Sequence, residues 1–178
     1  MSFKKLAALG AALFSPLLSA CDDANGPAVV NTYDHGGVWE NVVYAGKDSP
    51  ILVNIHGNPF GGDANLLADN VLLHMSNAIS QRVLHYTTNP AEAKSTSIKV
   101  ILLFGADKTA NGRKICEGKL PEVKPIEGDK ITLRAVFCSD EQLMSDVEGW
   151  VKNVTGPDDK RFKVLVGDIT RQLFRVNA

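Results

Sequence analysis

Short runs of β-branched and aromatic residues, separated by turn-forming stretches, recur along the chain. Residues 29–33, 38–44 and 51–55 are three such runs, and each predicts a strand. Residues 45–50 contain glycine, aspartate, serine and proline, so an antiparallel hairpin is expected between the second and third runs. The strongly apolar run at 98–104 is typical of a strand buried in the centre of a sheet.

Two further strands are predicted in the second half of the chain. Residues 113–117 form a short one that contains Cys116. Residues 130–138 alternate apolar and polar side chains, as expected when one face of a strand is buried. The stretch between them, residues 119–129, holds two prolines and a glycine and is expected to be an exposed loop.

Apolar residues at helical spacing predict a long helix from residue 64 to about residue 82, with Asp63 as its N-cap. Its apolar face is broad and its polar stripe is narrow, so this helix is expected to pack across the sheet. A second helix is predicted to begin at a capping box formed by Ser139 and Gln142 and to stop at Gly156-Pro157.

The last segment, residues 158–174, repeats a helical stripe of apolar residues, although its Val-Leu-Val run and Gly167 leave a strand as the alternative. The order along the chain is therefore strands, a helix, strands and two helices. This order predicts an α+β fold, in which one long helix and two C-terminal helices pack on a mostly antiparallel sheet.

The N-terminal residues show a different pattern. Lys4 and Lys5 precede an apolar run at 6–18, which is shorter than the roughly 20 residues that a membrane-spanning helix needs. A basic start, a short apolar run and small residues before a cleavage site describe a secretory signal peptide. The residues Leu18-Ser19-Ala20-Cys21 resemble the lipobox of bacterial lipoprotein precursors.

This resemblance implies cleavage between Ala20 and Cys21, diacylglycerol on the Cys21 sulfur and acylation of the new amino terminus. Two or three acyl chains on one residue anchor a protein stably in a membrane. The alternative is an ordinary signal peptide that a cysteine happens to follow. Asp22 resembles the residue that retains enterobacterial lipoproteins in the inner membrane, so we expect the periplasmic side of the envelope, at that membrane.

The expected organisation has three parts. Residues 1–20 are a signal peptide, residues 21–27 a lipidated tether, and residues 28–178 a single α+β domain. Removing the signal peptide leaves 17 lysines and arginines against 20 aspartates and glutamates, because Lys4 and Lys5 are lost from the 19 basic residues. The mature chain has no basic block, so nucleic acid is not an expected partner.

Three cysteines are present, and Cys21 is assigned to the lipid. Cys116 and Cys138 then remain as a pair in an oxidising compartment, which predicts a structural disulfide. A redox or metal-binding pair is the competing interpretation. It is disfavoured because the sequence has no Cys-x-x-Cys motif and no histidine near either cysteine.

Residues 56–62, His-Gly-Asn-Pro-Phe-Gly-Gly, form the densest turn-forming stretch. Their His-Gly start resembles the loop that supplies oxyanion donors in esterases. Those enzymes also need a Gly-x-Ser-x-Gly elbow, which no serine of this chain provides. A tight turn from strand to helix is the favoured interpretation. Main-chain N–H groups at a helix N-terminus can also hold an anion, so His56 and Asn58 are candidate ligand-binding residues.

The long predicted helix supplies a second set of candidates. His74 lies on its apolar face, and Asn70 and Asn77 border it one turn away on either side. These three residues are candidates for the polar lining of a groove. A core histidine that hydrogen-bonds a backbone carbonyl is the commoner arrangement.

The remaining histidines do not indicate a metal site or a cofactor. His35 follows Asp34, and His56 and His85 are far from it in sequence, without His-x-His or His-x-x-x-His spacing. No set of nucleophile, base and orienting residue is recognisable either, so no catalytic residue is assigned.

Three functions of different classes remain. The favoured one is a non-enzymatic envelope lipoprotein that binds another protein through its sheet edge or a helix face, with the membrane as its second partner through the lipid on Cys21. The alternative is a carrier or sensor for a lipid or small apolar ligand held between sheet and helix. A hydrolase is the third.

Overall fold

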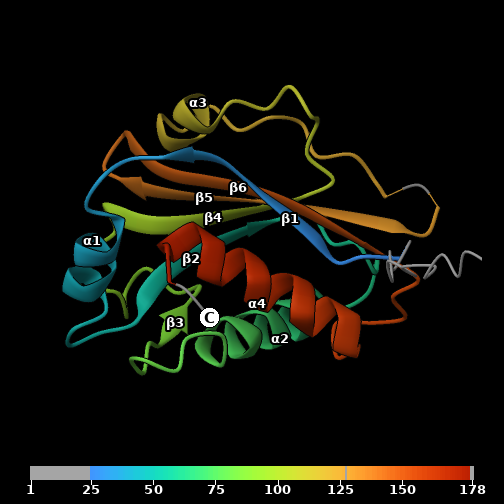
Figure 1. Cartoon of the computed structure of the whole chain (residues 1–178), viewed down its shortest axis with the longest axis horizontal. Helices are drawn as coiled ribbons and strands as arrows, with labels where there is room; N and C mark the ends of the chain where they lie inside the picture. The colour runs from blue at the N-terminus through green and yellow to red at the C-terminus, as the bar shows by residue number, and fades with distance from the viewer. Residues whose placement is uncertain (1–24, 127, 177–178) are drawn as a thin grey trace, which may run out of the picture.

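A computed structural model describes residues 25–126 and 128–176 (Figure 1). The predicted signal peptide, the lipobox and Cys21 lie outside these residues. None of the helices among the described residues is long and apolar enough to cross a membrane.

The described residues form a mixed α/β fold, in which one sheet is flanked by helices. The strands are β1 (Ala28–Asp34), β2 (Ile51–His56), β3 (Tyr86–Thr87), β4 (Ile98–Phe104), β5 (Lys130–Ser139) and β6 (Gln142–Lys152). The helices are α1 (Val38–Ala45), α2 (Ala64–Ser76), α3 (Gly112–Cys116) and α4 (Lys160–Phe174). The strands lie side by side in the order β1-β6-β5-β4-β2-β3.

The sheet is mixed, so the prediction of a mostly antiparallel sheet is wrong. β1, β6, β5 and β4 pair with one another antiparallel, whereas β2 runs parallel to both β4 and β3. The reason is α2, which follows β2 and carries the chain back along the sheet before β3 begins. Such a crossover joins parallel strands, whereas a tight turn joins antiparallel ones.

The two faces of the sheet are covered differently (Figure 1). α2 and α4 pack side by side on one face, over the larger of two buried clusters. Its largest fully buried side chains include Phe104, Leu133, Phe137, Phe162 and Phe174. α3 covers the other face, over a smaller cluster that includes Ile101, Leu103, Ile115, Val136 and Leu143.

Two predicted strands are helices, because their apolar spacing fits a helix as well as a strand. The hairpin expected between residues 38–44 and 51–55 does not form, because 38–44 belong to α1. Val38, Val42 and Ala45 of α1 are buried, and this spacing places them on one helical face. The strand expected at 113–117 is α3, whose N-cap Asn111 accepts hydrogen bonds from two main-chain N–H groups.

The helix predicted from Ser139 is strand β6, and the capping box does not form. Asp140 has a φ of 53° in the turn that joins β5 to β6, so the chain reverses into an antiparallel hairpin. The spacing of Leu143, Val147 and Val151 also fits one face of a helix, but these residues lie in a strand that is buried along most of its length.

The other predicted elements are confirmed within small shifts of their ends. These are β1, β2, β4, β5, α2 with its N-cap Asp63, and α4, although α2 ends at Ser76 and not near residue 82. Cys116 and Cys138 form the predicted disulfide, with their Cα atoms 5.6 Å apart. The bridge ties α3 to β5 in the middle of the sheet.

The first described residues are held against the end of β6. The main-chain N–H of Lys152 donates to the Asn25 carbonyl oxygen at 2.7 Å, and the Asn153 side chain donates to the Asn25 side chain at 2.7 Å. Gly26 is buried against the Trp150 backbone and ring. The chain therefore enters the fold at a fixed point beside the C-terminal end of β6.

Candidate functional site

At one edge of the sheet, four of the six residues of β2 have no strand neighbour on their outer side in the part of the chain that the structure describes. β3 has only two residues, which pair with Ile51 and Leu52 of β2. On the same side of β2, no strand among the described residues continues along Val53–His56. We call residues 53–56 the free edge of β2.

Strand geometry decides which main-chain groups face outwards. The Ile51 N–H donates to the His85 carbonyl, so Ile51 faces the β3 side. In a parallel sheet, the N–H and C=O of one residue point to the same neighbour, and successive residues alternate. Ile55 therefore directs its N–H and C=O away from β4 and onto the free edge. Asn54 and His56 instead direct theirs to β4, with which they are in register.

A pocket of about 460 Å³ lies along the free edge. Its wall on one side is the free edge with Gly57 and Asn58, and its wall on the other is the first two turns of α2. The lining residues from α2 are Ala64, Leu67 and Ala68, and Thr88 closes the end next to β3. The lining of the pocket therefore combines apolar side chains with the polar groups of Asn54, His56 and Thr88.

The loop between β2 and α2 is tightly closed, as the turn interpretation predicts. Asn58 accepts a hydrogen bond from the Phe60 N–H at 3.0 Å and donates to the Gly62 carbonyl at 2.9 Å. Gly57 has a φ of 82°, and a Cβ at this position would lie 2.6 Å from the Phe104 carbonyl oxygen. Asp63 accepts from the Asn65 N–H at 2.8 Å, so a carboxylate of the chain already occupies the N-terminus of α2.

The structure divides the sequence-predicted candidates between two places. His56 and Asn58 line the pocket at the free edge. His74 and Asn77 line a separate groove of about 240 Å³ between α2 and α4. Asn70 belongs to neither lining, and its side chain donates to the Leu66 carbonyl one turn earlier.

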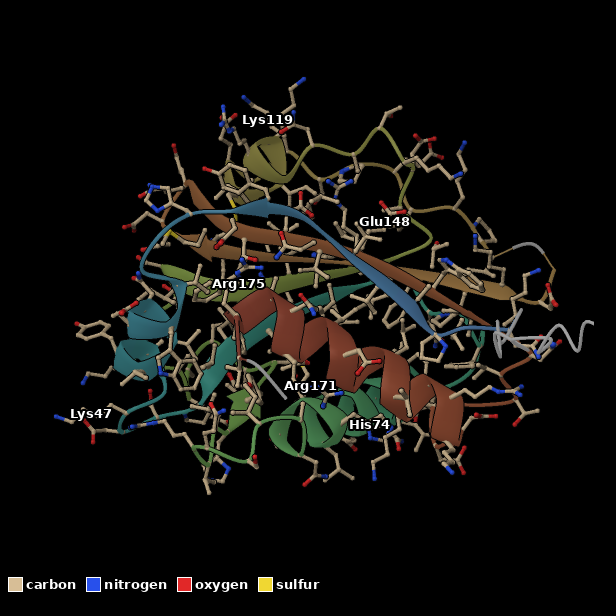
Figure 2. The ribbon with its side chains drawn as sticks, viewed as in Figure 1. Lys47, His74, Lys119, Glu148, Arg171 and Arg175 are labelled. Carbon is tan, nitrogen blue, oxygen red and sulfur yellow. A yellow bond between two sulfur atoms is a disulfide. The ribbon has the colours of Figure 1, made fainter. Side chains whose placement is uncertain are left out.

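The groove between α2 and α4 has basic side chains along α4 (Figure 2). Lys160 and Lys163 are exposed, whereas Arg171 is paired with Asp168 and donates to the Ala78 carbonyl at 3.3 Å. His74 is 7% exposed, and its Nε2 lies 2.9 Å from the Pro157 carbonyl oxygen. His74 is therefore mostly a core residue that joins α2 to the segment before α4, as the commoner arrangement predicts.

The catalytic arrangement that would indicate a hydrolase does not assemble around His35 or His56. His35 has Nδ1 2.9 Å from the Gly36 carbonyl oxygen and Nε2 3.2 Å from the Gln142 amide nitrogen. Asp34 forms an ion pair with Arg175 at 3.0 Å. His56 lies at the other end of the sheet, in the pocket. Within residues 25–126 and 128–176, no group of three or more His, Cys, Asp or Glu side chains is placed to hold a metal ion.

Sequence reasoning missed the free edge and Thr88. The two-residue strand β3 was not predicted, and it determines how much of β2 is covered. The only sequence signal is the pair Tyr86-Thr87, which is β-prone but too short to predict a strand alone.

Neither family models, nor curated proteins, nor solved structures show a match to this chain.

Proposed function

We propose that the protein is a lipid-anchored component of the bacterial envelope that binds a partner protein, and that the free edge of β2 is its binding site. In this proposal an extended segment of the partner lies in the pocket and continues the sheet beside β2. The anchor rests on the residues Leu18-Ser19-Ala20-Cys21. The binding mode rests on one observation, the uncovered main chain of β2 beside a pocket.

An uncovered strand edge is a natural place to add a peptide strand. Its N–H and C=O groups provide affinity, and neighbouring pockets select the side chains of the partner. Proteins that avoid such pairing place lysine, proline or a bulge on the edge. The free edge reads Val-Asn-Ile-His, with neither lysine nor proline, so it lacks these protections.

The alternative of an apolar-ligand carrier receives less support. A carrier needs an enclosed apolar cavity beneath α2. Apart from the pocket at its first two turns, the α2 side chains that face the sheet are closely packed. Leu67, Val71 and Met75 are at most 2% exposed, and all three belong to the main buried cluster.

The anchor is tested by metabolic labelling with palmitate. The wild-type protein should incorporate the label, and a Cys21→Ala variant should not, because the thiol that accepts the diacylglyceryl group is removed. Processing at Ala20 should also stop in the variant, so that the precursor accumulates. Equal labelling of both proteins contradicts the lipoprotein proposal.

The binding edge is tested by a photo-crosslinking amino acid placed at Thr88, inside the pocket, in cells that make the full chain. A control protein carries it at Lys119, beyond α3 on the other side of the sheet (Figure 2). We expect an adduct of one defined mass from position 88 and none from position 119. Equal adducts from both positions contradict the proposal.

A matched pair of variants then tests the main-chain contact itself. Ile55→Pro removes an N–H that β4 does not use, and Ile55→Ala removes the same side chain but keeps the N–H. The adduct should disappear with proline and persist with alanine, while both variants keep similar thermal midpoints. Loss of the adduct in both variants assigns the contact to the Ile55 side chain and contradicts strand addition.

A further inference from the structure

The position of the tether determines which end of the domain faces the membrane. Asn25 is fixed at the end of β6 by hydrogen bonds to Lys152 and Asn153. Only four residue steps separate Asn25 from Cys21, and an extended chain spans at most about 3.6 Å per residue, or about 14 Å in all. If Cys21 carries the lipid, the end of the domain at Asn25 stays within that distance of the bilayer surface.

Several basic residues gather at this same end. β5 begins at Lys130, which lies opposite Lys152 in the sheet, and the Asn153 N–H donates to the Asp129 carbonyl. α4 begins at Lys160, after the short loop that follows β6. Figure 1 shows the start of β1, the start of β5, the end of β6 and the start of α4 together at one end of the molecule.

The charges at this end favour an anionic partner. Its basic residues are Lys130, Lys152, Lys160, Arg161 and Lys163, and the acidic residues described there include Asp129, Asp158 and Asp159, together with Asp63 at the start of α2. The Asp159 carboxylate is occupied within the fold, because it accepts hydrogen bonds from the Arg161 and Thr155 N–H groups. Its negative charge therefore interacts with the N-terminus of α4.

A tryptophan completes the surface. The Trp150 ring is partly exposed, and the Lys130 ammonium lies 4.6 Å from its centre. Tryptophan is enriched at the headgroup level of membranes, because its ring is apolar and its N–H is polar. Basic side chains close to a membrane are attracted to its anionic lipids.

We infer that this end of the domain is a membrane-docking surface for anionic phospholipid headgroups, with Lys130, Lys152, Lys160 and Trp150 at its centre. The inference rests on the lipid anchor of the proposed function. It adds an orientation to that function. β2 runs parallel to β4, and Phe104 at the end of β4 pairs with Leu133 near the start of β5. The free edge, which is the second part of β2, therefore lies at the docked end. The partner segment is then recognised close to the bilayer.

The fluorescence of the two tryptophans can report this orientation, because Trp39 and Trp150 lie at opposite ends of the domain. Trp39 is in α1, which follows β1, and the seven residues of β1 place α1 about 20 Å from the docked end (Figure 1). The variant Trp39→Phe leaves only Trp150 emission, and Trp150→Phe leaves only Trp39 emission.

The full-length mature lipidated protein is reconstituted into vesicles of phosphatidylcholine and phosphatidylglycerol that contain a nitroxide-headgroup lipid. We expect quenching of Trp150 in the Trp39→Phe protein and unchanged emission of Trp39 in the Trp150→Phe protein. In the Trp39→Phe background, Lys152→Glu with Lys160→Glu should abolish most of the quenching. The matched charge reversals Lys47→Glu with Lys119→Glu, away from the docked end, should leave it unchanged (Figure 2).

Sedimentation of the vesicles separates the two proposals. Protein that does not sediment with vesicles has no lipid anchor, and the proposed function then fails first. Protein that sediments but shows equal quenching of Trp39 and Trp150 keeps its anchor and overturns the docking surface. Quenching of Trp150 that survives the reversal of Lys152 and Lys160 also overturns the headgroup contact.

Discussion

Arg134 and Asp146 form a buried, bidentate ion pair on the α3 side of the sheet. Arg134 donates from Nε to Oδ1 at 2.9 Å and from Nη2 to Oδ2 at 2.6 Å. The two side chains are only 10% and 4% exposed. Gly112 of α3 packs directly on the Asp146 carboxylate, and a Cβ there would collide with it. The pair therefore joins β5, β6 and α3.

We predict that Arg134→Met lowers the free energy of unfolding by about 3–5 kcal/mol, because it leaves the Asp146 carboxylate buried without its partner. Adding Asp146→Asn should recover part of this loss, since the uncompensated charge is then removed. Urea unfolding of the wild type, both single variants and the double variant measures the coupling. Losses that simply add contradict a direct interaction of the two side chains.

We also predict that the disulfide is needed to hold α3 on the sheet. α3 has only five residues, too few to be stable alone, and Cys116 is 22 positions before Cys138. Replacing both cysteines with serine should cost about 3 kcal/mol of stability by the loop-entropy estimate. Hydrogen exchange should accelerate in α3 more than in β4. Two reactive thiols in unfolded, unreduced protein would show that the bond is absent.

A third prediction concerns Asp159, the N-cap of α4. Its pKa is lowered chiefly by the hydrogen bond from the Arg161 N–H, with a smaller contribution from Thr155. Because the folded-state pKa lies below the unfolded-state value, the ionised cap stabilises the fold above the ordinary aspartate pKa of about 3.9. That stabilisation is lost as the pH falls through the lower folded-state pKa.

Asp159→Ala should therefore cost about 1 kcal/mol near neutral pH. The difference from the wild type should shrink below pH about 4, as the wild-type cap becomes protonated. The exposed neighbour Asp158→Ala serves as the control and should change stability much less at either pH. Thermal unfolding at a series of pH values measures both variants. A cost for Asp159→Ala that stays constant with pH argues against an ionised cap.

The elements that sequence alone identified are those with one clear periodicity. β4 is strongly apolar, and β5 alternates in its first half, although it is buried on both faces from Leu133 to Cys138. α4 carries a helical apolar stripe, which the structure favours over the alternative of a strand. The predictions for the residues of α1 and β6 were wrong for a common reason. Valines spaced four residues apart, such as Val38 and Val42 or Val147 and Val151, occur on one face of a helix and also in a strand.

The candidate site was only partly accessible to sequence reasoning. The turn chemistry of residues 56–62 pointed to His56 and Asn58, and both residues line the pocket. The free edge itself depends on which strands become neighbours and on how short β3 is. Pairing of this kind arises from tertiary packing, so local propensity contains little information about it.

The pairing of β1 with β6 has a consequence for the order of folding. β1 precedes every other strand of the described residues and β6 follows them all, and the bonded residues Thr32 and Asp146 are 114 positions apart. Contacts between such distant residues form slowly, because a long loop must close first. A chain that emerges with its N-terminus first therefore exposes β1 before the residues of β6 have emerged. β1, the first strand of the described residues, is then the last to join the sheet.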